Sequence, residues 1–328
     1  MTGSDSMTAL LYWPADRVDH LETMRTAARA ADPFQVRMVE SLDALDLSRA
    51  RAFAVSDAHM DDSMIDMIRR APRLEFIQLL SSGSEATAAA SLPAKLAISN
   101  APGIWAPSVA EHAVALLLAL TRQLPYLLDL QGRHEWRPDL VRPRLHGLEG
   151  MSVAVVGCGA IGRAIGARLA PFGVTRIGVS RTGAGAPGDA FDELAPVDSL
   201  AQVLDRVEAL FLSVPLSDAT HHLIAGPELQ ALGPNGFLVN TARGPVVDSQ
   251  ALVHALTTDQ IAGAAIDVAD PEPLPADSPL WTTKNVIIAP HVGSHPSNPL
   301  TAGRRLGALL KGNLERLHHG QVPENLIR

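Results

Sequence analysis

Three polar patches in the second half of the chain carry residue types that can move a proton and hold an anion. They are Asn240–Gly244, Asp267–Pro273 and Pro290–Ser294. Each follows an apolar run that indicates a buried strand, and open α/β sheets bind ligands beyond the carboxyl ends of such strands. A histidine can exchange a proton near neutral pH, a neighbouring carboxylate stabilises its charged form, and an arginine binds carboxylate or keto oxygens through several donors. The patches therefore predict a ligand site with acid–base chemistry.

A glycine-rich turn follows the apolar run Val153–Val156 and opens a helical segment. In that setting the spacing G-x-G-x-x-G predicts a site for the pyrophosphate of a dinucleotide. Gly157 permits the tight turn, Gly159 lets the backbone approach the pyrophosphate at the helix N-terminus, and Gly162 allows close helix packing. The cofactor-binding residues predicted in this turn are Gly157, Gly159, Ala160, Ile161 and Gly162.

The next predicted strand ends in Ser180-Arg181-Thr182, where an NAD enzyme usually places an acid for the ribose hydroxyls. A guanidinium can bind a 2′-phosphate with two donors, and hydroxyls can donate to it, whereas a carboxylate would repel it. We therefore expect NADP(H) in preference to NAD(H). The alternative is that Arg181 is a solvated loop residue and that Asp189 or Asp192 contacts the ribose.

Composition excludes several classes of protein. The 328-residue chain is 47% hydrophobic and carries a formal net charge of −8, without a run of basic residues, so neither disorder nor nucleic-acid binding is expected. Cys158 is the one cysteine, and we expect it to face the core rather than to sense redox state. The longest apolar run, Ala113–Leu120, is too short to span a membrane. These features favour a cytoplasmic protein that does not bind membranes. The pairs His221-His222 and His318-His319 lack metal-site spacing, so no metal is expected.

Short apolar runs alternate with helical segments along most of the chain, which predicts doubly wound parallel sheets. The expected strands are Ala9–Trp13, Gln35–Val39, Ala52–Ser56, Glu75–Leu80, Leu96–Ser99, Val153–Val156, Arg176–Val179, Ala209–Ser213, Phe237–Asn240, Ala264–Val268 and Val286–Ala289. Helices are expected near 20–31, 62–71, 108–120 and 300–318, the third with Ser108 as N-cap and Glu111 completing a capping box. An irregular stretch is expected from Gly132 to Gly150.

Together, the ordered motifs resemble the D-isomer-specific 2-hydroxyacid dehydrogenase family. The resemblance runs from about Leu74 to Val292 and includes Val214-Pro215-Leu216 with Thr220. The strand end Ser180–Thr182 is similar to that of the family's NADP-preferring glyoxylate/hydroxypyruvate reductase branch. The resemblance implies a Rossmann cofactor domain over residues 104–295 and a flavodoxin-like substrate domain over 1–103 plus 296–328, with a cleft between them.

The family's catalytic arginine, glutamate and histidine fall on Arg243, Glu272 and His291. By resemblance, His291 is the general acid/base, in preference to its neighbour His295, and Arg243 also binds substrate. The substrate carboxylate would meet the backbone of Ser82 and Gly83, in the loop after Glu75–Leu80. The further cofactor contacts implied by the family are Val214, Pro215, Thr220, Thr241, Ala242, Asp267 and Gly293.

The expected activity is hydride transfer between NADP(H) and a small 2-keto or 2-hydroxy acid such as glyoxylate or hydroxypyruvate. Two alternatives stay open: a dehydrogenase for a larger 2-keto acid that uses NADH, and a dinucleotide-sensing scaffold without turnover. The resemblance also implies a homodimer, with the apolar helix after Ser108 as its natural surface. Trp136 is either a core aromatic or a residue that reaches the neighbouring subunit's substrate pocket.

Overall fold

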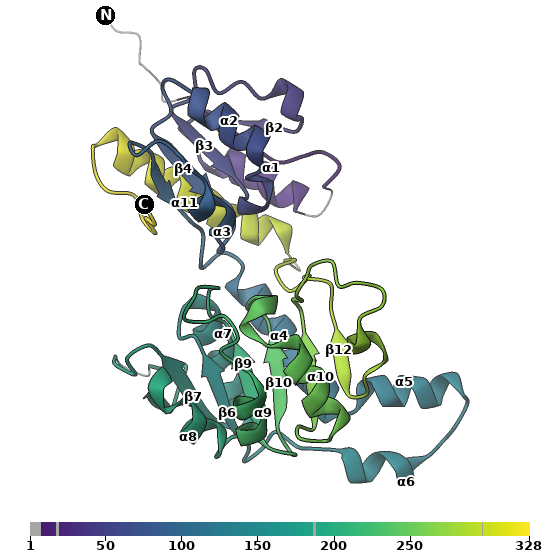
Figure 1. The fold of residues 1–328 in the computed structure, drawn as a ribbon. Coiled ribbons are helices and arrows are strands. Elements are labelled where there is room, and N and C mark those ends of the chain that lie inside the picture. Colours follow the sequence, from purple (N-terminus) through teal and green to yellow (C-terminus); the bar gives the residue numbers. More distant parts are fainter. Residues whose placement is uncertain (1–7, 18–19, 186–187, 297) are drawn as a thin grey trace, which may run out of the picture. The chain divides into compact units, whose positions relative to one another are not determined.

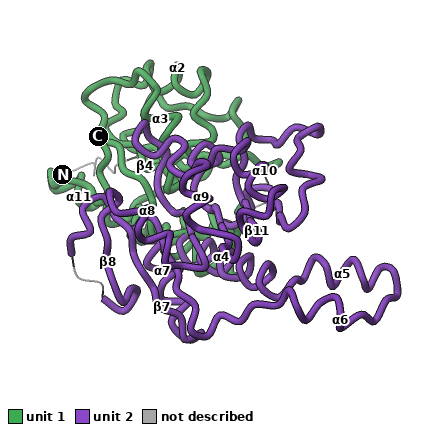
Figure 2. Tube along the Cα trace, turned by 60° about the horizontal axis from the view of Figure 1, so that its bottom comes forward, with its two compact units in different colours: residues 1–105, 295–328 green, residues 106–294 purple. Residues whose placement is uncertain are grey.

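The computed structural model describes residues 8–17, 20–185, 188–296 and 298–328, which form two compact units (Figures 1 and 2). One unit comprises residues 1–105 and 295–328, and the other comprises residues 106–294. Each is built on a sheet of parallel strands, five in the first and seven in the second. The predicted class, α/β with two parallel sheets, is confirmed.

The first unit has the strand order β2-β1-β3-β4-β5, so the chain changes direction across the sheet next to β1. Its strands are β1 Ala9–Tyr12, β2 Val36–Val39, β3 Ala52–Val55, β4 Phe76–Leu79 and β5 Ala97–Ser99. Its helices are α1 Leu21–Ala30, α2 Asp62–Arg70, α3 Glu85–Ala89 and α11 Pro299–His318. Asp61 and Asn298 cap α2 and α11 through their side chains, as acceptors of this kind do at helix N-termini.

Helices cover both faces of this sheet. Met64, Ile65 and Ile68 of α2 pack on one face, and α11 lies against α1 on the other. A Cβ atom on Gly303 of α11 would lie 2.5 Å from the Thr23 carbonyl oxygen of α1, so glycine is needed where the helices meet. The C-terminal helix is therefore part of the core of the first unit.

The second unit has the strand order β12-β11-β10-β9-β6-β7-β8. Its strands are β6 Ser152–Val156, β7 Thr175–Ser180, β8 Glu193–Pro196, β9 Ala209–Leu212, β10 Phe237–Asn240, β11 Gly263–Ile266 and β12 Val286–Ile288. Its helices are α4 Ala106–Thr121, α5 Leu124–Gly132, α6 Pro138–Val141, α7 Ala160–Leu169, α8 Leu200–Leu204, α9 Gly226–Leu232 and α10 Ser249–Thr257. Apolar side chains of α4 and α7 pack on one face, and those of α8, α9 and α10 pack on the other.

The predicted cap of α4 is wrong. The helix begins at Ala106, two residues before Ser108, with Pro107 in its first turn, where a missing N–H costs little. Glu111 makes no capping box and instead pairs with Arg168 of α7, 3.0 Å away. Most apolar side chains of α4 are buried inside the unit. Within the described part of the second unit, the exposed leucines lie on the following helix, α5.

Two other features depart from the expected pattern. The edge strand β8 was not expected, because its sequence Glu-Leu-Ala-Pro is short and ends in proline, which only an edge strand tolerates. The stretch expected to be irregular contains α6, and with α5 this helix projects from the sheet of its unit (Figure 1). Of the helices that the structure describes, none alone is long and apolar enough to cross a membrane; α4 and α5 reach that length only jointly, across a 60° bend.

Candidate active site

The three polar patches follow three adjacent strands, because β10, β11 and β12 lie side by side in parallel. Parallel strands bring their carboxyl ends to one edge of the sheet. Arg243 lies in the turn after β10, Glu272 in the longer loop after β11, and His291 in the turn after β12. These three side chains are the ones that the sequence predicts to be catalytic.

His291 and Glu272 are in direct contact. His291 Nδ1 lies 2.9 Å from Glu272 Oε2, and the other carboxylate oxygen accepts a hydrogen bond of 3.0 Å from the Ala269 N–H. The bond to Glu272 raises the pKa of His291, while burial and the charge of Arg243 oppose that rise. Burial alone would raise the pKa of Glu272, but the bonds from His291 and Ala269 lower it. The pair therefore favours a charged imidazole beside a carboxylate, with His291 Nε2 left to exchange a proton with a ligand.

Arg243 is held by its own turn. Its Nη1 donates 2.7 Å to the Ala242 carbonyl oxygen, and its charge lowers the pKa of both His291 and Glu272. Asn240, buried at the end of β10, accepts from the Ala242 N–H at 3.0 Å and donates to the Arg243 carbonyl oxygen at 3.1 Å. Asn240 thus fixes the turn that carries the arginine, a role that the sequence did not assign to it.

Asp267, which the sequence predicts to contact the cofactor, also has contacts within the second unit. Its carboxylate is buried at the end of β11 and accepts from the N–H groups of Val292 and Gly293, at 2.9 and 3.0 Å. His112 Nε2 of α4 lies 3.2 Å from the same carboxylate. The side chain of Asp267 is thus committed to the segment that follows His291. Neither Asp267's partners nor His112 were predicted from the sequence.

The glycine-rich turn has the geometry that a pyrophosphate needs. Gly157 has a φ of 105°, and a Cβ atom on Gly162 would lie 1.8 Å from the Gly157 carbonyl oxygen. A Cβ atom on Gly159 would meet nothing within 4 Å, so this side of the turn is open. The N–H groups of Ala160 and Ile161, in the first turn of α7, donate to no residue that the structure describes. A dinucleotide phosphate fits the turn, because such amides attract anions.

At the end of β7, hydroxyl groups shape the loop. Ser180 Oγ accepts from the Gly183 N–H at 3.0 Å, and Thr182 Oγ1 accepts from the Ala184 N–H at 3.2 Å. Arg181 is exposed and makes no hydrogen bond or ion pair within the described part of the chain. Its guanidinium is therefore available to a ligand.

The remaining cofactor-loop residues have structural contacts. Thr220 closes the turn after β9 by donating 2.7 Å to the Pro215 carbonyl oxygen, and Val214 packs against the core. Thr241 donates 3.2 Å to the Leu212 carbonyl oxygen and ties β10 to β9. Cys158 packs against the core beside α7, and burial raises the pKa of its thiol, which opposes reactivity.

In the first unit, the loop Ser81–Ser84 follows β4 as expected. The N–H groups of Ser82 and Gly83 have no acceptor within the described ranges of the chain. The buried carboxylate of Asp57 accepts from Ala86 N at 3.0 Å and Thr87 N at 2.8 Å, and so anchors the helix that follows the loop. This role could not be predicted from the sequence, because Asp57 and Thr87 are 30 residues apart.

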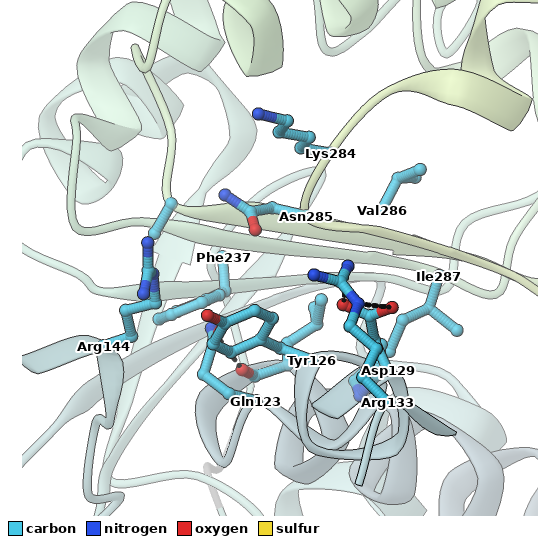
Figure 3. Close-up of a pocket in the computed structure, with 13 residues that line it drawn as sticks. Gln123, Tyr126, Asp129, Arg133, Arg144, Phe237, Lys284, Asn285, Val286 and Ile287 are labelled. Carbon is cyan, nitrogen blue, oxygen red and sulfur yellow. Dashed lines mark hydrogen bonds and ion pairs between the residues drawn. The ribbon is translucent and has the colours of Figure 1, made fainter. Parts of the chain in front are cut away.

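Other candidate groups have partners of their own. His295 belongs to the first unit, where its ring lies 5.2 Å from that of His20, and His221 stacks on His222. A pocket of about 410 Å³ opens beside α5, at the amino ends of β10 and β12 (Figure 3). Figure 3 shows Lys284 and Asn285 on one side of it and the Arg133–Asp129 ion pair on the other. This pocket is at the opposite end of the strands from the catalytic turns.

Comparisons with known proteins agree with this architecture. A family model described as the NAD binding domain of D-isomer specific 2-hydroxyacid dehydrogenase matches residues 114–293. A glyoxylate reductase of Thermococcus litoralis is 33% identical over 274 residues, covering 80% of this chain and 79% of the relative. That of Aeropyrum pernix is 32% identical over 304 residues, covering 90% and 88%.

Solved structures give the same result. A D-isomer specific 2-hydroxyacid dehydrogenase family protein of Aeromonas salmonicida matches with a TM-score of 0.82 at 26% identity, covering 98% of this chain and 99% of that one. A D-isomer specific 2-hydroxyacid dehydrogenase of Xanthobacter autotrophicus, in complex with NADPH and MES, matches with a TM-score of 0.80 at 26% identity over 98% of both chains. Since the family model also spans more than half of the sequence, the resemblance drawn from the motifs is confirmed: the chain belongs to the D-isomer specific 2-hydroxyacid dehydrogenase family of NAD(P)-dependent oxidoreductases.

Proposed function

We propose that the chain reduces a small 2-keto acid, such as glyoxylate or hydroxypyruvate, with NADPH, and that His291 is the proton donor. The observation that carries this proposal is the 2.9 Å contact between His291 Nδ1 and Glu272 Oε2. It is supported by the relatives whose names are glyoxylate reductase, which align along most of this chain. The bound nicotinamide supplies the hydride.

The residues of the chain then have separate tasks. His291 Nε2 gives its proton to the keto oxygen as the alkoxide develops, and Glu272 stabilises the imidazolium before transfer. Arg243 binds the substrate carboxylate or keto oxygen and orients the carbonyl carbon. Ser82 and Gly83 offer backbone N–H groups, which have no acceptor in the described part of the first unit, to the substrate carboxylate.

The preference for NADP(H) rests on the end of β7. Arg181 is exposed there, between two hydroxyl residues, and no acid stands at the strand end. Asp192, one of the acids that could contact a ribose instead, is engaged by Arg176 at 2.7 Å and also accepts from the Arg176 N–H at 2.8 Å. This engagement favours the 2′-phosphate of NADP over the free hydroxyl of NAD. The Xanthobacter autotrophicus relative was solved with NADPH.

A homodimer formed through α5 and α6 is the assembly that we propose. Leu127 and Leu128 of α5 are 40% and 66% exposed, and Trp136, between the two helices, is 93% exposed. Such a concentration of apolar side chains on a projecting segment is typical of an interaction surface. Trp136 is therefore not a core aromatic, and we expect it to be covered by a second copy of the chain.

A panel of keto acids, assayed with NADPH and with NADH, tests the activity. We expect turnover of glyoxylate or hydroxypyruvate, a higher kcat/KM with NADPH, and almost none in His291→Asn, which should still bind NADPH. His254→Asn, an exposed histidine of α10, is the matched control. Turnover only of larger acids with NADH would replace the proposed substrate and cofactor. Tight NADPH binding without oxidation by any acid would instead indicate a dinucleotide-sensing scaffold.

A further inference from the structure

A half-buried histidine and a buried carboxylate meet beside the segment that carries His291. His112 lies on α4, is 24% exposed, and places Nε2 3.2 Å from Asp267 Oδ1. That nitrogen is shielded from solvent and makes no hydrogen bond within the described residues, so its approach to the Asp267 carboxylate is a close polar contact. Asp267 is the charged group that lies next to His112 Nε2, at 3.2 Å.

Asp267 in turn holds the segment 291–293 from three points. Its two carboxylate oxygens accept from the Val292 and Gly293 N–H groups, and its carbonyl oxygen accepts from the His291 N–H at 2.8 Å. Every backbone N–H of this segment thus donates a hydrogen bond to Asp267. The position and charge of the Asp267 carboxylate decide the path of the backbone there.

The segment needs such support because His291 is in a left-handed conformation. Its φ is 54°, which a residue with a Cβ atom adopts only at an energetic cost. The αL conformation turns the imidazole towards Glu272, and a relaxed backbone would move Nδ1 away from that carboxylate. A small displacement at such a site costs rate, because proton transfer depends on hydrogen-bond reach.

The packing around this carboxylate leaves little room for adjustment. A Cβ atom on Gly293 would lie 2.6 Å from Asp267 Oδ2 and 3.1 Å from His112 Cδ2. The imidazole, the carboxylate and the glycine are therefore in close contact. A buried carboxylate that loses one of its partners is costly, so removal of His112 is expected to loosen Asp267 rather than to leave it in place.

We propose that His112 is a positioning residue for the catalytic histidine: it fixes the Asp267 carboxylate and, through it, the backbone of residues 291–293. The rate effect expected from this role rests on the proposed function of His291. The effect on the backbone does not, and can be measured without any substrate.

The test uses three variants of the full chain. His112→Leu removes the polar group at similar size, His112→Gln can return an amide nitrogen to the place of Nε2, and His146→Leu is the control. His146 is half-buried in the same unit, with its ring 5.1 Å from that of Phe237. Hydrogen exchange of the peptide containing residues 290–294, kcat and KM for the keto acid, and the Kd of NADPH are measured for each.

In His112→Leu we expect faster exchange in that peptide and a kcat lowered about 10-fold or more, with the Kd of NADPH within about 2-fold of wild type. His112→Gln should recover most of both losses, and His146→Leu should show neither. If His112→Leu does not fold, His112→Asn, whose amide ends short of Nε2, takes its place with the same expectations.

Wild-type exchange and kcat in a folded His112→Leu would overturn the proposal. Equal losses in the Leu and Gln variants would also overturn it, because they would show a role in packing alone. If no keto acid is turned over by wild type, the proposed function fails, yet faster exchange in His112→Leu with recovery in His112→Gln would still support the positioning role.

Discussion

Replacement of Glu272 by glutamine tests the acid–base assignment directly, because it removes one charge and almost no volume. The amide oxygen can keep the 3.0 Å bond from the Ala269 N–H, so the loop after β11 should keep its path. The amide nitrogen then faces His291 Nδ1 in place of a carboxylate oxygen at 2.9 Å. What changes is the stabilisation of the charged imidazole.

The size of the effect follows from the exposure of the pair. A hydrogen bond to a charged group contributes about 1.5–3 kcal/mol, roughly twice as much as a neutral one. The side chains of His291 and Glu272 are 47% and 39% exposed, so water screens their charges and the contribution falls below that range. A loss of about 1 kcal/mol in the transition state corresponds to a roughly 5-fold fall in kcat/KM for keto-acid reduction.

The sign of the pH dependence is the sharper test. Glu272 raises the pKa of His291, and reduction requires the protonated imidazole. In wild type, the rate of reduction therefore stays high until the pH rises through that raised pKa. In Glu272→Gln the decline should begin at lower pH, so that the loss is greatest on the alkaline side. Oxidation of the hydroxy acid requires the neutral imidazole, and its rise with pH should move to lower pH as well.

The assay is kcat/KM against pH in both directions, with Glu228→Gln as the control. The Glu228 carboxylate also accepts a backbone N–H, from Ala225 at 3.0 Å, but at the N-terminus of α9. The Glu228→Gln variant should leave both pH profiles unchanged. A uniform fall at every pH in Glu272→Gln, without a shift of either profile, would refute the reasoning, since it would show that Glu272 acts on the geometry of the site and not on the protonation of His291.

Four further substitutions test the cofactor site and the core. Arg181→Asp is expected to lower kcat/KM with NADPH about 10- to 100-fold and to affect NADH little, because a carboxylate repels the 2′-phosphate; steady-state kinetics with an unchanged cofactor ratio would contradict this. Gly162→Ala should fail to fold or lose several degrees of Tm, since its Cβ atom would lie 1.8 Å from a backbone oxygen, whereas Gly159→Ala should keep its Tm and bind NADPH more weakly. Asn313→Leu should lower the free energy of unfolding by about 2–4 kcal/mol in urea titrations, because it removes the partner of the buried Gln78 side chain.

Strands and helices whose own residues show a clear hydrophobic pattern could be predicted from the sequence. The apolar runs around Val153–Val156 and Phe237–Asn240 are strands because both faces of a parallel sheet are covered, which makes their sequences continuously hydrophobic. His291, Glu272 and Arg243 could be predicted to converge because each follows such a strand. By contrast, the strand Glu193–Pro196 pairs with one neighbour alone, at the sheet edge, so its sequence needs no apolar pattern.

Contacts between residues far apart in the sequence could not be predicted. Gln78 accepts a hydrogen bond of 2.8 Å from Asn313, 235 residues away, and both side chains are fully buried. The 3.2 Å contact of His112 with Asp267 also joins residues that lie far apart in the sequence of the second unit. A lone polar residue on an apolar helix or strand gives no sign of its partner. The error at Ser108 has a related cause: a serine followed three residues later by a glutamate is a cap only where the helix starts, and Glu111 has a better partner in Arg168.

Asn240 and Asp267 are buried at the ends of neighbouring strands. In each case the backbone groups that surround the side chain determine which type of residue can occupy the position. Asn240 ends β10 and faces one N–H and one carbonyl oxygen of the next turn, so it needs both a donor and an acceptor. Asp267 comes directly after β11 and faces two N–H groups and an imidazole nitrogen, so it needs acceptors alone. Asn240→Asp would place a carboxylate oxygen against a carbonyl oxygen, and Asp267→Asn would place an amide N–H against a backbone N–H. Both clashes would be buried. Arg243 and His291 are therefore held by side chains whose chemistry the backbone of each turn selects, before any ligand is bound.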